Sequence, residues 1–435
     1  MVTKFSDKIK KKKAKIAVIG LGYVGLPLAV EFAKEGFRAL GVDLDRRKVD
    51  SINAGDSYIL DIPSEEIRPL AKKGILKATS DYSRLKDVDA IIICVPTPLR
   101  KTKDPDMSFI VSAADAIAKN LRKGQVIVLE STTYPGTTEE VILPMLENTG
   151  LKVGRDFSLG FSPERIDPGN PRYMTHNIPK VISGMTPQCR QNIALLYSQI
   201  MEKVVTVSSV KVAEMVKLLE NTFRSVNIGL VNELALMCDS LKVDVWEIIE
   251  AAKTKPFGFM PFYPGPGLGG HCIPIDPIYL AWKARIQGFE PRFIDLASKI
   301  NADMPEYVAE RISRSLNSRF GKAVKGAKVL IIGLSYKKDV TDTRESPAFE
   351  VIEKLEERGA FISYYDPFVR EAVLCGHKVK SVPLSAAEIR KNDCVVIVTD
   401  HSNIDYDLIV ENAKFVLDTR NALRNIKKRD KIERL

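Results

Sequence analysis

The sequence predicts an α/β protein with two doubly wound parallel-sheet domains, joined by a helical middle region that contains a long central helix. Near both ends of the chain, short apolar runs alternate with amphipathic stretches, which favours parallel strands covered by helices on both faces. The middle third replaces this alternation with a long helical pattern that contains no proline. A chain of 435 residues has room for several domains of roughly 100–200 residues each.

These changes of pattern divide the chain into four predicted regions. We expect a basic tail over 1–15 and a first α/β domain over 16–205. A helical domain is predicted over 206–319, and a second, smaller α/β domain over 320–435.

Five apolar runs predict the strands of the first α/β domain, and the stretches 27–36 and 112–124 predict helices between them. The predicted strands are 16–22, 38–44, 90–96, 125–132 and 157–163.

The helical domain begins with one continuous pattern over 210–241, in which Gly229 is the one glycine. A shorter helix over 243–252 precedes a loop rich in glycine and proline, and further helices are predicted beyond it. The loop is 254–277 and the later helices are 278–287 and 306–319. In the last domain the predicted strands are 328–336, 361–367, 394–400 and 415–420, with a helix over 347–358.

The formal net charge of +10 is unevenly distributed, because the first 15 residues hold seven lysines and one aspartate. The rest of the chain is close to balanced, so a globally basic surface for nucleic acid is not predicted. The lysine run could bind an anionic partner. Its single aromatic residue, Phe5, makes no interleaved aromatic pattern, and we expect a solvated tail instead.

The sequence also favours a cytoplasmic protein. No apolar run approaches the ~18 residues of a membrane-spanning helix, and the first residues lack the apolar core of a signal peptide. The six cysteines are scattered without a C-x-x-C pair, so a disulfide framework or a cysteine zinc site is not expected. The four histidines add no metal cluster, and we predict no metal cofactor.

The segment Gly20-Leu21-Gly22-Tyr23-Val24-Gly25 matches G-x-G-x-x-G between a predicted strand and a predicted helix. This is the context of a Rossmann dinucleotide site, in which the helix N-terminus receives the pyrophosphate. Asp43 ends the second predicted strand, where a carboxylate accepts hydrogen bonds from the adenosine ribose. Its charge favours NAD over NADP, although Arg46 and Arg47 lie nearby.

A second unusual segment, 264–277, carries four glycines ahead of Cys272. We expect a helix to begin at Pro277 with Asp276 as its N-cap, and a cysteine beside a helix N-terminus can be stabilised as a thiolate. A lone cysteine is more often a small buried apolar residue. On a chain with an NAD site, however, a reactive cysteine favours aldehyde oxidation through a thioester. His271 is an unfavourable partner for it, since adjacent side chains usually diverge.

Seven motifs occur in an order that resembles the UDP-glucose/GDP-mannose dehydrogenase family over essentially the whole chain. The GHCIPIDP variant is most similar to the branch that oxidises UDP-N-acetylhexosamines, UDP-N-acetylglucosamine above all. The motifs are GLGYVG, VPTP (95–98), STTYPGT (131–137), SPER (162–165), KLLENTF (217–223), GPGLGGHCIPIDP (265–277) and YKKDVTDTRES (336–346).

The resemblance implies a four-electron oxidation of a sugar C6 alcohol to a carboxylate with two NAD, for the synthesis of surface polysaccharide precursors. Cys272 would form the thioester. Lys217 would act as a base or stabilise the reacting oxygen, and Asn221 would donate a hydrogen bond to the same oxygen. These two residues lie four apart on the long helix and share a face. The resemblance assigns the handling of water and protons to Asp276, Glu164 and Thr132.

The same resemblance implies the binding residues. The cofactor would contact Gly20, Gly22, Tyr23, Val24, Gly25, Asp43, Pro96, Thr97, Thr132 and Arg344. The UDP-sugar would contact Glu164, Arg165, Lys217, Asn221, Tyr263, Gly265, Gly267, Gly269, Tyr336 and Lys337. The family pattern further implies an active site between domains and a homodimer, or a higher homo-oligomer, formed through the long helix.

Three departures bear on the substrate. The stretch 253–257 has no arginine where the glucose-specific branch commonly carries one, and Pro168 stands where that branch has a second glutamate. Both weaken UDP-glucose as the substrate. The segment 333–336, GLSY, is not a second G-x-G-x-x-G, which favours the sugar nucleotide over another NAD in the last domain.

Other functions stay open at this point. The same chemistry could act on UDP-N-acetylmannosamine, UDP-N-acetylgalactosamine or UDP-glucose. An ordinary two-electron dehydrogenase would explain the NAD loop and leave the cysteine loop without a role. An NAD-sensing binding module would explain only the glycine loop and the lysine tail.

Overall fold

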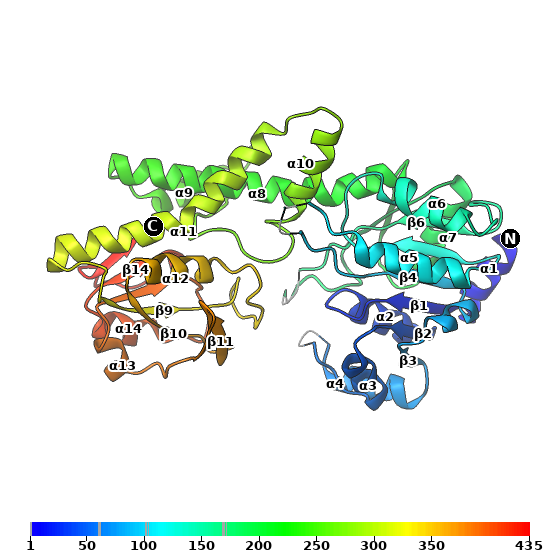
Figure 1. The fold of residues 1–435 in the computed structure, drawn as a ribbon, viewed down its shortest axis with the longest axis horizontal. Coiled ribbons are helices and arrows are strands. Elements are labelled where there is room, and N and C mark those ends of the chain that lie inside the picture. The colour runs from blue at the N-terminus through cyan, green and yellow to red at the C-terminus, as the bar shows by residue number, and fades with distance from the viewer. Residues whose placement is uncertain (1, 60–61, 101, 103, 168–169, 171) are drawn as a thin grey trace. The chain divides into compact units, whose positions relative to one another are not determined.

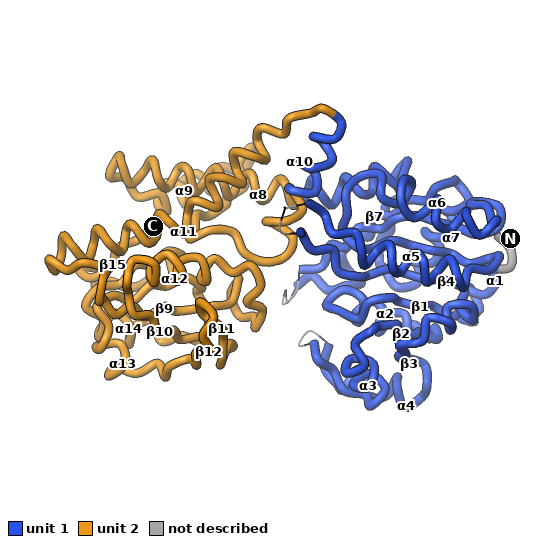
Figure 2. Tube along the Cα trace, viewed as in Figure 1, with its two compact units in different colours: residues 1–220, 278–287 blue, residues 221–277, 288–435 orange. Residues whose placement is uncertain are grey.

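The computed structural model describes residues 2–59, 62–100, 102, 104–167, 170 and 172–435 (Figure 1). The chain forms two compact units, coloured separately in Figure 2. Unit 1 contains residues 1–220 and 278–287, and unit 2 contains residues 221–277 and 288–435.

Unit 1 is built on an eight-stranded sheet with the order β3-β2-β1-β4-β5-β6-β7-β8. The first six strands are parallel in the Rossmann order, whereas β7 runs antiparallel to β6. The strands are β1 (Lys15–Ile19), β2 (Arg38–Val42), β3 (Leu76–Thr79), β4 (Ala90–Ile93), β5 (Val126–Leu129), β6 (Ser158–Phe161), β7 (Lys180–Gly184) and β8 (Val204–Thr206). The five predicted strands are confirmed, and β3, β7 and β8 were not predicted.

Helices cover both faces of this sheet, and the alternation of side chains along each strand serves two separate cores. In β1, Ile16 and Val18 pack into one core with α2 and α7, while Ala17 and Ile19 pack into the other with α5. The helices are α2 (Gly25–Lys34), α3 (Arg46–Ala54), α4 (Ser64–Lys72), α5 (Ser108–Asn120), α6 (Leu143–Glu147) and α7 (Pro187–Tyr197), with a 3₁₀ turn (Tyr82–Asp87) and a π turn (Thr138–Ile142).

The lysine-rich start of the chain forms helix α1 (Val2–Lys10), so the expectation of a solvated tail is wrong. Phe5 and Ile9 lie one turn apart and are buried against α7. The ammonium of Lys8 lies 2.6 Å from a carboxylate oxygen of Asp89. The high lysine content gave no indication of this amphipathic helix. The helix is stabilised because its apolar face packs against the rest of the fold.

Four helices lie between the two sheets in the sequence. Helix α8 (Val210–Leu241) has the predicted bounds, and α9 (Val245–Ala252) lies within its predicted range. Helix α10 (Asp276–Ile286) starts one residue before its predicted first residue, so Asp276 is its first residue and not its N-cap. Helix α11 (Arg292–Phe320) is much longer than predicted and continues through Pro305.

Unit 2 contains a five-stranded parallel sheet with the order β10-β9-β13-β14-β15 and a separate hairpin of β11 and β12. The hairpin, β15 and the last two helices were not predicted. The elements are β9 (Lys328–Ile332), α12 (Pro347–Glu357), β10 (Phe361–Tyr365), β11 (Glu371–Leu374), β12 (His377–Lys380), α13 (Ala386–Arg390), β13 (Cys394–Ile397), α14 (Tyr406–Asn412), β14 (Val416–Asp418) and β15 (Ile432–Arg434). Among the described residues, no helix combines the length and apolar character that crossing a bilayer requires.

Candidate active site

The first glycine turn has the geometry that a dinucleotide needs. Gly20 adopts a φ of +90°, which allows the sharp turn at the end of β1. A Cβ on Gly25 would lie 1.9 Å from the carbonyl oxygen of Gly20, so only glycine permits this close packing of α2 on the turn. A Cβ on Gly22 would meet nothing within 4 Å, which leaves its backbone open to a ligand. No side chain caps α2 at Val24, so the helix N-terminus can receive a phosphate.

Asp43 follows β2 and fixes this turn while keeping part of its carboxylate in reach of solvent. One oxygen accepts the N–H of Leu21 at 2.8 Å, and the other accepts the N–H of Asp45 at 2.9 Å. Lys48 pairs with the same carboxylate at 3.2 Å, whereas Arg47 pairs with Asp45 at 3.0 Å. Asp43 thus occupies the position at which a carboxylate receives the ribose hydroxyls of NAD.

Two loops at the carboxyl edge of the unit 1 sheet carry further predicted cofactor residues. The carbonyl oxygen of Thr97, next to Pro96, accepts the hydroxyl of Tyr279 at 2.6 Å, which ties the VPTP loop to α10. Thr132 is half-buried on the loop after β5. Glu214 of α8 holds that loop by accepting the N–H of Gly136 at 2.6 Å and that of Thr138 at 3.0 Å.

Glu164 is buried and held on both carboxylate oxygens. Oε2 receives the ammonium of Lys180 at 3.0 Å, and Oε1 accepts the N–H groups of Arg165 and Ile166 at 2.6 Å each. Burial opposes its ionisation, but Lys180 outweighs burial and lowers the pKa of Glu164. The guanidinium of Arg165 pairs with Glu220 of α8 at 2.6 Å, so this predicted substrate residue already anchors its own loop.

Helix α8 presents Lys217 and, one turn later, Asn221. Lys217 is buried. Its charge lowers the pKa of Glu164, which places the two groups in one electrostatic environment. Asn221 donates from Nδ2 to Oδ2 of Asp276, and its Oδ1 accepts a hydrogen bond from Arg224. The structure therefore brings Asn221 and Asp276 together.

Cys272 opens the helical turn that leads into α10. Its carbonyl oxygen accepts the N–H groups of Ile275 and Asp276 at 3.2 and 2.9 Å. Cys272 and Cys375 are the two cysteines that are not buried, and Glu356 raises the pKa of the Cys375 thiol to about 11. Cys272 is thus the partly exposed cysteine at a helix start, where a thiolate is favoured.

The glycine-rich loop before Cys272 packs against a cluster of unit 2 side chains. A Cβ on Gly269 or Gly270 would lie within 3 Å of the side chain of Tyr336, and one on Gly265 would lie 2.5 Å from Nη1 of Arg420. The Lys337 ammonium lies 5.9 Å from the centre of the Tyr336 ring. These contacts surround the loop with cationic and aromatic groups suited to a nucleoside diphosphate.

Buried amides, which sequence reasoning missed, fix the same loop. Oδ1 of Asn232 accepts the Gly265 N–H at 2.9 Å, and Nδ2 of Asn232 donates to Asn301 at 2.8 Å. Tyr263 donates to Glu250 at 2.7 Å and stacks on Trp246. No local motif marks these partners, because they come from distant helices.

Arg344 and His271 lie in one electrostatic environment. Arg344 is exposed and pairs with Asp342 at 2.7 Å. Burial and the charge of Arg344 lower the pKa of His271, so this imidazole is neutral at pH 7. Pro168, the departure from the glucose-specific pattern, lies outside the described residues. No group of three metal-ligating side chains occurs among the residues that the structure describes.

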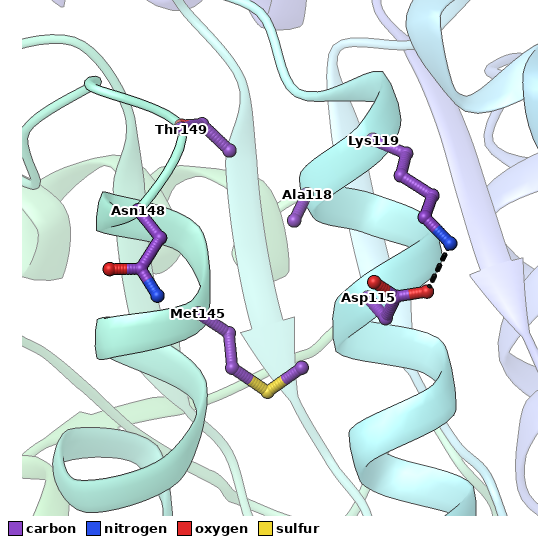
Figure 3. Close-up of a pocket in the computed structure, with 6 residues that line it drawn as sticks. All are labelled: Asp115, Ala118, Lys119, Met145, Asn148 and Thr149. Atoms are coloured by element: carbon purple, nitrogen blue, oxygen red, sulfur yellow. Dashed lines mark hydrogen bonds and ion pairs between the residues drawn. The ribbon is translucent and has the colours of Figure 1, made fainter.

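A surface hollow lies between α5 and α6 in unit 1 (Figure 3). Lys119 pairs with Asp115 at its rim, and no residue predicted for cofactor or substrate lines it. Its lining residues are Asp115, Ala118, Lys119, Met145, Asn148 and Thr149.

Comparison with known families accounts for this arrangement. Three domains of one family match the chain in order: its NAD binding domain at 14–201, its central domain at 211–303 and its UDP binding domain at 330–425. The chain belongs to the UDP-glucose/GDP-mannose dehydrogenase family. It is therefore an NAD-dependent nucleotide-sugar dehydrogenase, and the predicted resemblance is confirmed.

Relatives of this dehydrogenase match it along nearly its full length. The UDP-N-acetyl-D-glucosamine 6-dehydrogenase of Pseudomonas aeruginosa is 35% identical over 418 residues, which are 96% of this chain and 97% of the relative. The NDP-N-acetyl-D-galactosaminuronic acid dehydrogenase of Ralstonia nicotianae is 34% identical over 93% of this chain and 95% of its own. The solved structure of the UDP-D-ManNAc dehydrogenase of Pyrococcus horikoshii superposes with a TM-score of 0.88 at 33% identity, covering 97% and 98% of the two chains.

Proposed function

We propose that this dehydrogenase oxidises the C6 hydroxymethyl group of UDP-N-acetylglucosamine to a carboxylate through a thioester on Cys272. The observation that carries the proposal is the setting of Cys272 at the first turn into α10, with Asp276 and Asn221 hydrogen-bonded to each other one turn further on. A thiol that is partly exposed at a helix start can act as a nucleophile, unlike the buried cysteines of this chain.

The residues present fit NAD at the first glycine turn, where Gly22 leaves the backbone open and Asp43 faces the ribose position. When bound, NAD would supply the hydride acceptor for both oxidation steps, so each sugar consumes two NAD. The fit rests on side chains and backbone that the fold already holds in place.

Side chains of this protein act at each step of the reaction. Oxidation of the alcohol gives an aldehyde, and the Cys272 thiolate adds to its carbon to form a thiohemiacetal. Oxidation of that adduct gives the thioester, which water hydrolyses to the acid and the free thiol. Lys217 and Asn221 donate to the reacting oxygen, while Glu164 and Asp276 accept protons and Thr132 positions the water.

The family's UDP binding domain and the cluster around the glycine loop support a UDP-sugar. Tyr336, Lys337 and Arg420 are the groups that we assign to the uridine diphosphate. The N-acetylglucosamine assignment rests on the GHCIPIDP motif and on the relative in Pseudomonas aeruginosa. The relatives named for N-acetylmannosamine and N-acetylgalactosaminuronate make those sugars the alternatives.

The decisive experiment measures NADH release with UDP-N-acetylglucosamine, UDP-N-acetylmannosamine, UDP-N-acetylgalactosamine, UDP-glucose and GDP-mannose. We expect the first to be turned over fastest and to yield two NADH per acid. Cys272→Ser should abolish acid formation, whereas Cys375→Ser should retain wild-type turnover. A faster rate with another sugar would overturn the sugar assignment, and one NADH per turnover with a carbonyl product would overturn the thioester.

We also propose that the enzyme is a homodimer assembled through α8. Four large apolar side chains of unit 2 lie exposed along one face of this helix, at successive spacings of about two, two and one helical turns. They are Phe223, Leu230, Met237 and Leu241. Leu230→Glu should convert the dimer to a monomer in size-exclusion chromatography with light scattering, and a monomeric wild type would contradict the proposal.

A further inference from the structure

Glu164 belongs to a buried ion-pair network with Lys180 and Glu130. The ammonium of Lys180 lies 3.0 Å from Oε2 of Glu130 and 3.0 Å from Oε2 of Glu164. The three side chains are 5%, 0% and 10% exposed, respectively. Removing three charges from water is costly, and an apolar replacement is often as stable. Stability alone therefore gives little reason for this arrangement.

The sheet topology explains how the three groups meet. Glu130 directly follows β5, and Glu164 lies on the loop after β6. Because β7 runs antiparallel to β6, its first residue, Lys180, lies at the edge of the sheet where β6 ends. Lys180 thus joins the ends of two strands whose loops carry Thr132 and Glu164.

The remaining oxygens of the network are also occupied. Oε1 of Glu130 accepts the hydroxyl of Tyr197, and Oε1 of Glu164 accepts the backbone N–H groups of Arg165 and Ile166. The Glu164 carboxylate is therefore held on both oxygens in a single orientation. Such a group needs no reorganisation when a reaction requires it.

The network contains two carboxyl groups and one ammonium, so its charges do not cancel when both carboxyl groups are ionised. Burial and the nearby charge of Glu164 raise the pKa of Glu130 to about 7. Lys180 instead lowers the pKa of Glu164, aided by Lys217 of α8. The other titratable groups that face the network are Cys94 after β4 and Tyr197 of α7. A proton taken up here thus goes to the deep carboxyl group, Glu130.

We propose that Lys180 and Glu130 are positioning residues that hold Glu164 ionised and in one orientation at the carboxyl edge of the sheet. Glu130 takes the network's extra proton, and Lys180 keeps the Glu164 carboxylate available to accept a proton during turnover. This inference rests on the proposed function, in which Glu164 acts on the substrate.

The test compares the pH dependence of kcat/KM in Lys180→Met and Glu130→Gln. Lys180→Met leaves two buried carboxylates without their cation, so the acidic limb of the profile should move up by about one to three pH units. Glu130→Gln mimics the protonated carboxyl group that Glu130 already carries at the pH of this limb, so the limb should stay in place. In a Glu164→Gln background, Lys180→Met should shift nothing further.

Lys322→Met is the matched control, because it breaks an ion pair with Asp393 in unit 2. It should lower stability and leave the acidic limb unmoved. A merely structural role for Lys180 predicts the same outcome for Lys180→Met, and that result would overturn the inference. An upward shift of the limb in Glu130→Gln as large as that in Lys180→Met would also overturn it.

Two further measurements test the inference if a variant does not fold or if the proposed function fails. If Lys180→Met does not fold, Lys180→Gln, which removes the charge but keeps a polar side chain, should raise the limb, whereas Lys180→Arg, which keeps the charge, should retain the wild-type limb. If the wild type oxidises none of the five sugars, the proposed function fails. Infrared titration of the wild type and Glu130→Gln then decides the network: loss of the carboxyl signal that titrates near neutral pH supports it, and persistence of that signal overturns it.

Discussion

Strands β1 and β9, the first strands of the two large sheets, end in turns of the same conformation. Only the turn after β1 leaves space for a cofactor. Gly20 ends β1 and Gly333 ends β9, with φ values of +90° and +88°. Each donates its N–H to the end of the neighbouring strand, to Val42 at 2.8 Å and to Tyr365 at 2.9 Å. The backbone conformation is thus repeated in the two units.

The repetition extends to a carboxylate at the end of the second strand. The N–H of Leu21 donates to Asp43 at 2.8 Å, and the N–H of Leu334 donates to Asp366 at 2.7 Å. In both units the aspartate therefore fixes the turn by binding the residue after the glycine. Asp43 remains partly accessible, with its side chain 12% exposed, whereas the Asp366 side chain is fully buried.

The difference comes from what fills the space beyond the turn. In unit 2, His401 is fully buried with Nε2 3.1 Å from Asp366 and 3.2 Å from Ser335, and its Nδ1 accepts the N–H of Asp339 at 3.0 Å. The ring thus contacts Ser335, two residues after Gly333, whereas nothing lies within 4 Å of the Cβ position of Gly22, two residues after Gly20. A doubly wound sheet offers a site at this edge, and individual side chains decide whether the site is used.

The largest effects should come from adding a methyl group at a tightly packed glycine in each of the two turns. Gly25→Ala places a Cβ 1.9 Å from the Gly20 carbonyl, and Gly333→Ala places one 2.5 Å from Thr399. Each should destabilise its own unit by about 3 kcal/mol or more. Hydrogen exchange should show lost protection in β1 and β2 for the first variant and in β9 and β10 for the second. Loss in both units in either variant would mean that the turns are not independent.

The pH dependence of stability should also differ between the units. Burial raises the pKa of Glu214 in unit 1 to about 7, so its contribution is complete below pH 4.5 and is lost as the pH rises through 7. This loss amounts to about 3 kcal/mol. His401 helps to lower the pKa of Asp366 against the effect of burial, so in unit 2 that contribution is lost as the pH falls below 3.8.

Unfolding monitored by hydrogen exchange at pH 5 and pH 8 checks this difference. Unit 1 should be less stable at pH 8, and Glu214→Ala should flatten the change while lowering stability at pH 5. Equal stability of unit 1 at both pH values in the wild type would contradict the role given to Glu214.

A matched pair of aspartate substitutions separates cofactor binding from folding. Asp43→Asn should weaken NAD binding about ten- to hundredfold, the scale of a lost charge-assisted hydrogen bond, with little change in stability. Asp366→Asn should destabilise unit 2 by about 2 kcal/mol and leave the dissociation constant for NAD unchanged. Calorimetric titration with NAD measures the first effect and denaturant unfolding the second. Equal loss of NAD affinity in both variants would refute the distinction between the two turns.

We predict the smallest change in stability for a substitution at Gly22, where a Cβ would have open space. Gly22→Ala adds a Cβ that meets nothing within 4 Å, so stability should change by less than about 0.5 kcal/mol. The methyl group would nevertheless stand where the pyrophosphate approaches, and NAD affinity should fall about tenfold. NAD affinity equal to that of the wild type would place the pyrophosphate elsewhere.

Much of the fold followed from local sequence. The bounds of α8 were predicted because a long apolar periodicity without proline permits one continuous helix. The first glycine turn was predicted because the spacing of its glycines reflects backbone sterics within a few residues. Helix α1 was missed because two buried apolar residues among lysines give too weak a local signal.

The residues of the candidate site also fall into those that the sequence predicted and those that only the structure revealed. The sequence alone determined the segments that carry Asp43, Asn221 and Cys272, because Asp43 ends a predicted strand and the other two residues belong to short motifs. Only the tertiary structure decided that Lys180 reaches Glu164 and that His401 fills the second turn. Those contacts join residues far apart in the chain, and they form only when the strand order and direction bring buried charges to the same edge of a sheet.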